Sequence, residues 1–254
     1  MNTTKVYIDF EAITNPFARL VNLPSGTPYA YTLGLLNIHG QYQIKTFIID
    51  FKEHHNLNSI WTAIKNAIVS DILEINNTVN LKEVVFVGHN PVLENKCLKK
   101  LFPENNVEPL ISNTIVSLSK LTGKIFNIPY FNKIKKIIAD SGDSELNMRI
   151  KDRNGVIAAF AGYWLYTKSI KNLRANDRRK RFLIKMNKNL LLKELKRYSH
   201  DDVNKMLYIV SHPNETETLL KELLYKRELI KQIKNLELDD NLTIKEIKEK
   251  IWTL

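Results

Sequence analysis

Short apolar runs alternate with polar positions over the first third of the chain, and this pattern predicts β-strands. Runs rich in β-branched and aromatic residues cover Lys5–Phe10, Tyr29–Leu36 and Tyr42–Phe51. The turn-forming segment Asn37–Gly40 lies between the second and third runs and predicts a hairpin. A fourth strand is predicted at Val84–Val87, where a short apolar run is continuous.

Helical spacing of apolar residues follows these strands and dominates the second half. A helix is predicted over Asn58–Ile75. Its apolar face carries Ile60, Ile64, Ile68 and Ile72. A second helix is predicted from Asn90-Pro91 to Leu101, because Asn is a good N-cap and Pro suits the first helical position. A last strand is predicted at Thr114–Leu118, and after about residue 125 the pattern is mostly helical.

The C-terminal part of the chain is predicted to form two charged helices, over Glu215–Leu236 and Thr243–Trp252. Thr243 and Glu246 fit a capping box at the start of the second helix. A Pro follows the preceding helix within Ser211–Asn214, so we divide the chain into residues 1–212 and an extension, 213–254. The apolar stripe of the extension must be buried on something. Packing on the preceding domain, self-association and guiding a nucleic-acid strand are all open.

The order of the predicted elements indicates an α/β fold. Three strands, a helix, a strand, a helix, another strand and then helices are expected of a ribonuclease H-like mixed sheet flanked by helices, here with a helical C-terminal extension. The 254 residues suffice for one large domain with an appendage. No apolar run approaches the roughly 18 residues that a bilayer crossing requires, so no membrane partner is expected.

Charge and cysteine content bear on the class of partner, the kinds of site and the location of the protein. The net charge of +11 and pI near 9.5 favour a polyanionic partner such as nucleic acid. The excess of Lys, Asn and Ile also fits an A/T-rich genome, so charge alone leaves this open. Cys97 is the only cysteine, which excludes an internal disulfide and a multi-cysteine zinc site. The N-terminus runs straight into a strand, so we expect no signal peptide and a cytoplasmic location.

Two carboxylates lie at the end of the first predicted strand. Asp9 and Glu11 flank Phe10, and alternate residues of a strand point to the same face. Two adjacent negative charges beside an apolar strand are costly unless a positive charge lies between them. A hard divalent cation such as Mg²⁺ prefers oxygen ligands. The pair therefore marks a candidate metal site, and a strand that simply ends in solvent at Asp9 is the alternative.

Two further acids lie on predicted helices. Glu94 falls in the first turn of the helix after the fourth strand, where the helix dipole also favours an acid. Tyr198 and Asp202 are four residues apart and share a helix face. A helix that begins near Ser199, with Asp201 and Asp202 as ordinary first-turn acids, would explain the same residues.

The order of these pieces resembles the DEDD superfamily of 3′–5′ exonucleases, in its tyrosine-bearing branch. The matching motifs are Asp-Phe-Glu at residues 9–11, Glu94 in a strand–Asn–helix unit, and Tyr-x-x-x-Asp ending at Asp202. The chain is similar to RNase D and to the proofreading domains of family A polymerases. It is more similar to a bacterial group of DEDD-type proteins with His-Asn and then an acid in the second motif. The resemblance spans roughly residues 5 to 210 and rests on the motifs.

The resemblance implies a two-metal phosphodiester hydrolase that releases nucleoside 5′-monophosphates from RNA or single-stranded DNA. Asp9 would bridge two Mg²⁺ or Mn²⁺ ions, Glu11 and Asp202 would complete the tighter site, and Glu94 would support the looser one. Tyr198 would orient the attacking water.

Two positions qualify this match. The superfamily usually has Asp where this chain has Glu94, and the added methylene could loosen the second metal site. Asp201 competes with Asp202 for the last ligand position. We prefer Asp202 because only this residue lies four positions after Tyr198.

Substrate contacts are predicted at several residues near these motifs. Phe10 lies between the first two acids, and its backbone could meet the terminal nucleotide together with Asn90 of the second motif. Phe17 could stack on a base or belong to the core. Arg178 and Arg179 belong to the densest basic run, which either tracks the phosphate backbone or is a solvated helix face.

The sequence leaves the substrate and two other functional classes open. Discrimination between RNA and DNA depends on a few contacts to the 2′-OH that no motif here encodes. A nuclease-like fold that binds nucleic acid or protein without cutting is the main alternative. An endonuclease or transposase-like relative is the second, and those proteins carry a different late motif. The oligomeric state is not indicated.

Overall fold

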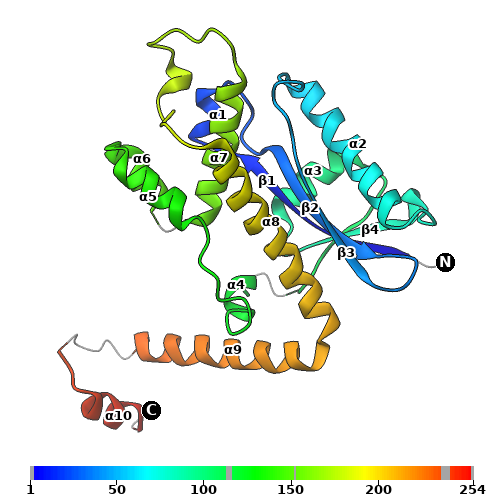
Figure 1. Cartoon of the computed structure of the whole chain (residues 1–254). Coiled ribbons are helices and arrows are strands. Elements are labelled where there is room, and N and C mark those ends of the chain that lie inside the picture. The colour runs from blue at the N-terminus through cyan, green and yellow to red at the C-terminus, as the bar shows by residue number, and fades with distance from the viewer. Residues whose placement is uncertain (1–2, 113–115, 152, 236–240, 253–254) are drawn as a thin grey trace.

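The computed structural model describes residues 3–112, 116–151, 153–235 and 241–252, and its centre is a five-stranded sheet (Figure 1). The strands are β1 (Thr4–Ile13), β2 (Thr27–Leu36), β3 (Tyr42–Ile48), β4 (Val84–Gly88) and β5 (Val107–Pro109), in the order β3-β2-β1-β4-β5. β1 pairs antiparallel with β2 and β2 with β3, whereas β4 runs parallel to both β1 and β5. The predicted α/β fold with a mixed sheet is therefore confirmed.

Helices cover both faces of the sheet. The longer ones are α2 (Leu57–Ile75), α3 (Val92–Leu101), α7 (Asn154–Ser169) and α8 (Lys188–Ser211). Shorter helices are α1 (Phe17–Leu20), η1 (Leu81–Glu83), α4 (Leu118–Leu121), α5 (Asn132–Asp140), α6 (Ser144–Ile150) and η2 (Arg178–Lys180). Tyr31 donates a hydrogen bond to Asp71 on α2, whereas its neighbour Thr32 bonds to Ser199 on α8. Since successive strand residues point to opposite faces, α2 and α8 lie on opposite faces.

The first four predicted strands and the first helix are confirmed, with small shifts at their ends. β1 extends to Ile13, so both Asp9 and Glu11 lie inside a strand. The hairpin turn closes with a hydrogen bond from Asn37 N–H to the Gln41 carbonyl. Asn56 and Ser59 form a capping box before α2, whose predicted isoleucine face is buried against the sheet. The sequence pattern was sufficient here because each of these elements carries an apolar run or a regular apolar face.

The last predicted strand is wrong in its described part. Residues 113–115 lie outside the described residues, Val116 and Ser117 belong to no strand, and Leu118 begins α4. The fifth strand is instead β5, which pairs with β4 between Phe86 and Val107. β5 has three residues, none of them buried, and such a segment carries no periodic apolar signal.

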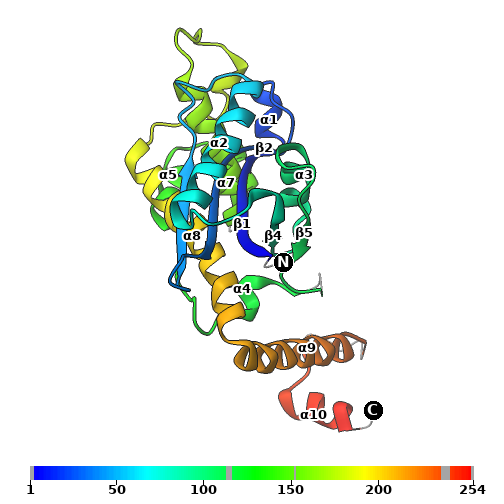
Figure 2. The ribbon, with the colours of Figure 1, turned by 90° about the vertical axis from the view of Figure 1, so that its right-hand side faces the viewer.

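The C-terminal extension contains both predicted helices, α9 (Pro213–Asn235) and α10 (Ile244–Trp252). α8 ends at Ser211, which confirms the helix boundary at this point, and the capping box of Thr243 and Glu246 is present. Early leucines of α9 pack against α4 and α8, but Tyr225 is 71% exposed and α9 has no buried residue. α9 and α10 project away from the sheet domain (Figure 2). Among the described helices, none combines the length and apolar character of a membrane span.

Candidate active site

The second half of β1 places two carboxylates, those of Asp9 and Glu11, beneath α8. Asp9 is paired with Thr32 of β2, and Thr32 points to α8 through its hydrogen bond to Ser199. Paired residues of an antiparallel ladder share a face, so Asp9 also points to α8. The register between β1 and β2 shifts between Glu11 and Ala12. Irregularities of this kind re-aim side chains, often beside active sites.

α8 crosses this face as one continuous helix, so Tyr198 and Asp202 lie in its middle. A helix beginning near Ser199 is therefore excluded. The Ser199 hydroxyl lies 2.8 Å from the Thr32 hydroxyl, and both residues are fully buried. A Cβ atom at Gly34 would lie 2.9 Å from a methyl group of Leu207, so glycine allows α8 to approach β2 closely.

Glu94 approaches the same region from the first turn of α3. It is 5% exposed, and one carboxylate oxygen lies 3.5 Å from the backbone N–H of Phe10, which donates to it. A Cβ atom at Gly88 would lie 2.9 Å from Pro91 and 3.1 Å from the Glu94 side chain. Glycine at the end of β4 therefore lets Glu94 reach β1. The predicted N-cap is wrong by one residue, because Pro91 is the N-cap and Asn90 adopts a left-handed φ of 50°.

Two of these acids, Asp9 and Asp202, line a pocket of about 420 Å³ that is open to solvent. The lining also includes His89, the exposed Asn90 and residues 116–119. The His89 Nε2 atom lies 2.9 Å from the Val116 carbonyl and 3.1 Å from the Leu118 N–H. A neutral ring makes one of these hydrogen bonds at a time, and either one ties this segment to β4. Burial lowers the pKa of His89.

The carboxylates are electrostatic neighbours although three separate chain segments contribute them. Burial raises the pKa of Asp9, and the charges of Glu11, Asp202 and Glu94 raise it further, in that order. Burial followed by the charges of Asp202 and Glu94 raises the pKa of Glu11. Each ionised acid therefore destabilises the others unless a cation compensates.

The donor set suits a hard divalent cation. Four carboxylates offer oxygen ligands, and Glu11 Oε1 is buried without a hydrogen-bond partner. As the side chains lie, the described residues contain no group of three or more His, Cys, Asp or Glu arranged to hold a metal ion. Glu94 accepts a hydrogen bond from the backbone N–H of Phe10, and Asp202 accepts one from the Lys205 ammonium group. Metal-bridging proximity of the four acids thus stays a prediction that requires side-chain rotation.

Lys205 is a further site residue, which the sequence motifs do not indicate. Its side chain is 2% exposed, and its Nζ lies 2.8 Å from Asp202 Oδ1. The Nζ also lies 5.0 Å from the centre of the Tyr130 ring. Lys205 follows Asp202 by three residues and Tyr198 by seven, so the three share one helix face. That spacing was visible in the sequence, but a lysine there is usually solvated.

Tyr198 is held by aromatic packing. Its ring centre lies 5.3 Å from that of Tyr130 and 5.2 Å from that of Phe131. Burial raises the pKa of Tyr198, and the charges of Glu11, Asp202 and Asp9 raise it further. Asp201 points elsewhere and accepts a hydrogen bond from the Tyr130 hydroxyl at 3.1 Å. The structure thus brings Asp202, and not Asp201, beside Asp9.

The predicted aromatic substrate contacts are buried. Phe17 is fully buried among the rings of Phe160, Tyr163 and Phe182, so its core role is correct and base stacking is wrong for this conformation. The Phe10 side chain is 3% exposed. Its backbone N–H faces Glu94. Apolar pattern alone does not distinguish a buried aromatic side chain from an exposed one.

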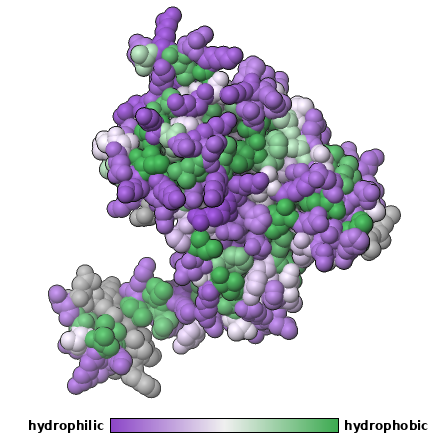
Figure 3. Space-filling view, in the orientation of Figure 1, coloured by the Kyte–Doolittle hydropathy of each residue, from purple (hydrophilic) through white to green (hydrophobic). Residues whose placement is uncertain are grey.

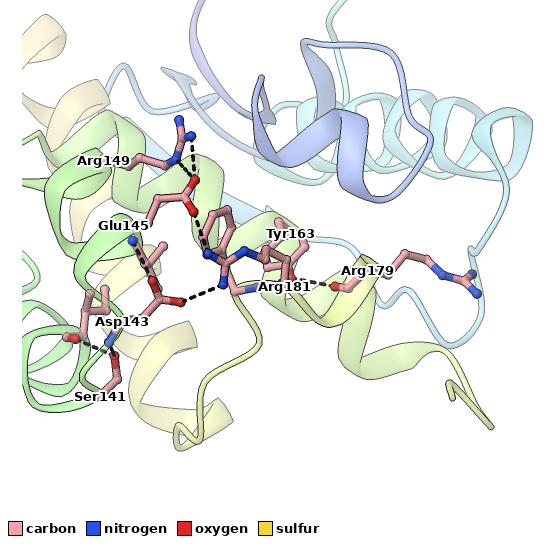
Figure 4. Close-up of polar contacts among 10 residues, drawn as sticks. Ser141, Asp143, Glu145, Arg149, Tyr163, Arg179 and Arg181 are labelled. Carbon is pink, nitrogen blue, oxygen red and sulfur yellow. Dashed lines mark hydrogen bonds and ion pairs between the residues drawn. The ribbon is translucent and has the colours of Figure 1, made fainter. Parts of the chain in front are cut away.

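The predicted arginine contacts are engaged within the protein. Arg178 donates to the Asn22 side chain, and Arg179 makes a two-point contact with Asp177. The backbone carbonyl of Arg179 accepts from the Tyr163 hydroxyl, and Arg181 lies between Asp143 and Glu145 (Figure 4). Neither arginine lines the acidic pocket. The basic run is a turn with one short helix, so a solvated helix face is wrong, whereas phosphate contacts at Arg178 and Arg179 stay a prediction.

We expect the free energy of unfolding in EDTA to fall as pH rises above about 4, the ordinary carboxylate range. A folded-state pKa that is raised means that the folded protein binds more protons than the unfolded chain, and this stabilisation is lost as the pH rises through the raised pKa. Glu11→Gln should make the free energy of unfolding fall less with pH. Glu83→Gln, at an exposed position, should leave this pH dependence unchanged. Urea unfolding at about pH 5 and about pH 8 measures both. If the free energy of unfolding fell equally between these pH values in the two variants, Glu11 would not be one of the acids whose pKa is raised in the folded protein.

Comparisons with protein-family models, with curated proteins and with solved structures found no match to this chain. The features of this chain that bear on its function are the order of its motifs and the arrangement of its acidic side chains.

Proposed function

We propose that the chain is a metal-dependent 3′–5′ exonuclease that releases nucleoside 5′-monophosphates from RNA or single-stranded DNA. The observation that carries this proposal is the grouping of acids from β1, α3 and α8 around Asp9, with Asp9 and Asp202 lining one open pocket. The sheet order β3-β2-β1-β4-β5, with β3, β2 and β1 antiparallel and β4 and β5 parallel to β1, supports a ribonuclease H-like assignment.

The acids would hold the metal ions. Asp9, Glu11, Glu94 and Asp202 supply oxygen ligands, for which Mg²⁺ and Mn²⁺ are suited. When bound, such ions activate water and stabilise the charge of the leaving 3′ oxygen. Lys205 positions Asp202 through its 2.8 Å contact, and Gly88 positions Glu94 through close packing.

Tyr198 would position the attacking water rather than deprotonate it. A phenol whose pKa is raised stays protonated at neutral pH, so it is a poor general base. Its ring is fixed by Tyr130 and Phe131, which orients the hydroxyl without a rotational cost. His89 lines the pocket as well, but its Nε2 atom contacts Val116 and Leu118, and its Nδ1 atom is buried without a hydrogen-bond partner.

Digestion of matched RNA and DNA oligonucleotides labelled at the 5′ end tests the proposal. With Mg²⁺ or Mn²⁺ we expect a ladder that shortens from the 3′ end, and no cleavage in excess EDTA. A circular substrate of the same sequence should stay intact. Undiminished cleavage in EDTA, or cleavage of the circle, would refute a metal-dependent exonuclease.

Binding of nucleic acid without cleavage is the second candidate function. It is favoured by the absence, among the described residues, of a ready-made group of metal-ligating side chains. Tight binding of the oligonucleotides with no metal-dependent shortening would support it.

Tyr198→Phe is expected to slow cleavage by about 10- to 100-fold while leaving oligonucleotide affinity nearly unchanged. The substitution removes only the hydroxyl and keeps the ring in its aromatic pocket. Single-turnover rate and affinity, measured on one labelled oligonucleotide, separate the two effects. Tyr208→Phe is a matched control, because the Tyr208 hydroxyl contacts Glu215 on the surface. A loss of affinity with an unchanged rate per bound complex would make Tyr198 a packing residue instead.

A further inference from the structure

A second pocket, of about 730 Å³, lies on the other side of α8 from the acidic cluster. It is formed where the end of β3 meets α7 and the first turns of α8. Lys188, Leu192 and Lys196 line it from α8, whereas Asp202 and Met206 line the acidic pocket. These two sets flank the stripe of α8 that faces the sheet. The volume is in the range of small-molecule and cofactor sites.

The rim of this pocket is basic. Five exposed lysines line it, contributed by the segment after β3, by α7 and by α8: Lys52, Lys168, Lys188, Lys193 and Lys196. None of them forms an ion pair with a described acid. The acid in the lining is Asp50, whose carboxylate accepts a hydrogen bond from the backbone N–H of Lys52. An excess of unpaired positive charge around a concave site attracts anions.

The floor is apolar and offers few free polar groups. Ile48 and Leu192 are half-buried and contribute apolar surface. Phe51 and Trp164 lie beneath them, each 2% exposed, and the Lys168 Nζ lies 5.7 Å from the centre of the Trp164 ring. In the space-filling view, an apolar area over α7 and the first half of α8 is bordered by hydrophilic side chains (Figure 3). The Trp164 Nε1 already donates to the Ile184 carbonyl, and the Ser169 hydroxyl to the Tyr166 carbonyl. Little on the floor is therefore free to read the hydrogen-bonding edge of a base.

We infer that this pocket binds single-stranded nucleic acid without base specificity, with a base on the apolar floor and successive phosphates on the lysine rim. A single carboxylate head group would need one lysine, whereas five unpaired lysines on three segments match a chain of phosphates. Base faces bind apolar and aromatic surface whatever their sequence, and lysines follow the backbone. The inference shares the nucleic-acid partner of the proposed function but requires no cleavage.

The test measures binding of labelled oligo(dT) and oligo(U) of about 12 nucleotides by fluorescence anisotropy in EDTA. The variant is Lys168→Ala with Lys193→Ala, two exposed positions on α7 and α8. Affinity should fall at least about tenfold. The plot of log affinity against log salt should become shallower by about 1.4, because each phosphate contact on a single strand contributes about 0.7.

The matched control is Lys133→Ala with Lys136→Ala on α5, which removes the same charge from two exposed positions elsewhere. Its affinity and salt slope should stay close to those of the parent. If the pocket variant and the control bind alike, the inference is wrong, whether or not the protein cleaves. If the pocket variant loses binding in a protein that does not cleave, the inference stands and the exonuclease proposal fails.

Trp164 gives a local signal for the same question. With Trp61→Phe and Trp252→Phe, Trp164 is the remaining tryptophan. We expect oligo(dT) to quench its fluorescence, because a base would lie against the pocket floor. Dodecanoate, an acyl anion, is the competing probe. Quenching by dodecanoate but not by the oligonucleotide would overturn the nucleic-acid assignment.

Discussion

Asp9→Asn is expected to lower the cleavage rate by about a thousandfold or more, while the protein remains folded. Asp9 is the acid whose pKa is raised by all three of the other carboxylates, so it lies electrostatically at the centre of the cluster. A neutral amide of the same shape cannot replace its charge toward a metal ion. In EDTA at neutral pH the same change should stabilise the fold, because it removes a charge that is costly to bury.

A control for this substitution lies on α8. Asp201→Asn changes an acid that contacts Tyr130 and does not line the pocket, so the rate should change little. Both rates are measured under single-turnover conditions with Mn²⁺, and thermal unfolding is measured in EDTA. If Asp9→Asn retains the parent rate, the acidic cluster is not the site of cleavage. A large loss for Asp201→Asn alone would transfer the ligand role to Asp201.

Opposite effects on stability and activity are typical of a site that stores unfavourable electrostatics for function. The buried, unpartnered Glu11 Oε1 is part of that cost. A scaffold protein gains nothing from it.

The central sheet could be predicted from the sequence because each strand carries its own local signal. β1, β2, β3 and β4 are apolar runs bounded by turn residues, and α2 has a regular isoleucine face. The positions of the acids followed from motif order, which reflects how the strands and helices succeed one another. β5 could not be found because it is short, without buried residues, and is defined by its pairing with β4.

Contacts between distant segments explain the remaining errors. Phe17 is buried because α7 and residue 182 cover it, and Arg179 is engaged because Asp177 lies beside it. The lysines of the second pocket are scattered over residues 52 to 196, and only the folding of β3, α7 and α8 brings them together. Lys205 is buried between Asp202 of its own helix and the ring of Tyr130, which lies 75 residues earlier in the chain.

Lys205→Met is expected to lower the free energy of unfolding in EDTA by about 3 kcal/mol. The lysine is almost completely buried, and Asp202, 18% exposed, would keep its charge without a partner. The exposed Lys196→Met on the same helix should change stability by less than about 0.5 kcal/mol. Urea unfolding of the parent and both variants measures these differences. Equal stabilities of the Lys205 and Lys196 variants would mean that the ion pair contributes nothing.

Saturating Mn²⁺ should reduce the deficit of Lys205→Met if the acids hold a metal ion. Both the lysine and the cation compensate the charge of the same carboxylates, so the cation should stabilise the variant more than the parent.

The double variant Asp202→Asn, Lys205→Met should be less destabilised than the sum of the two single changes predicts, with a coupling energy of about 1–3 kcal/mol. If Mn²⁺ leaves the stability loss of Lys205→Met unchanged, Lys205 does not act on the metal-binding carboxylates. That result would leave Lys205 as a structural partner of Asp202 alone.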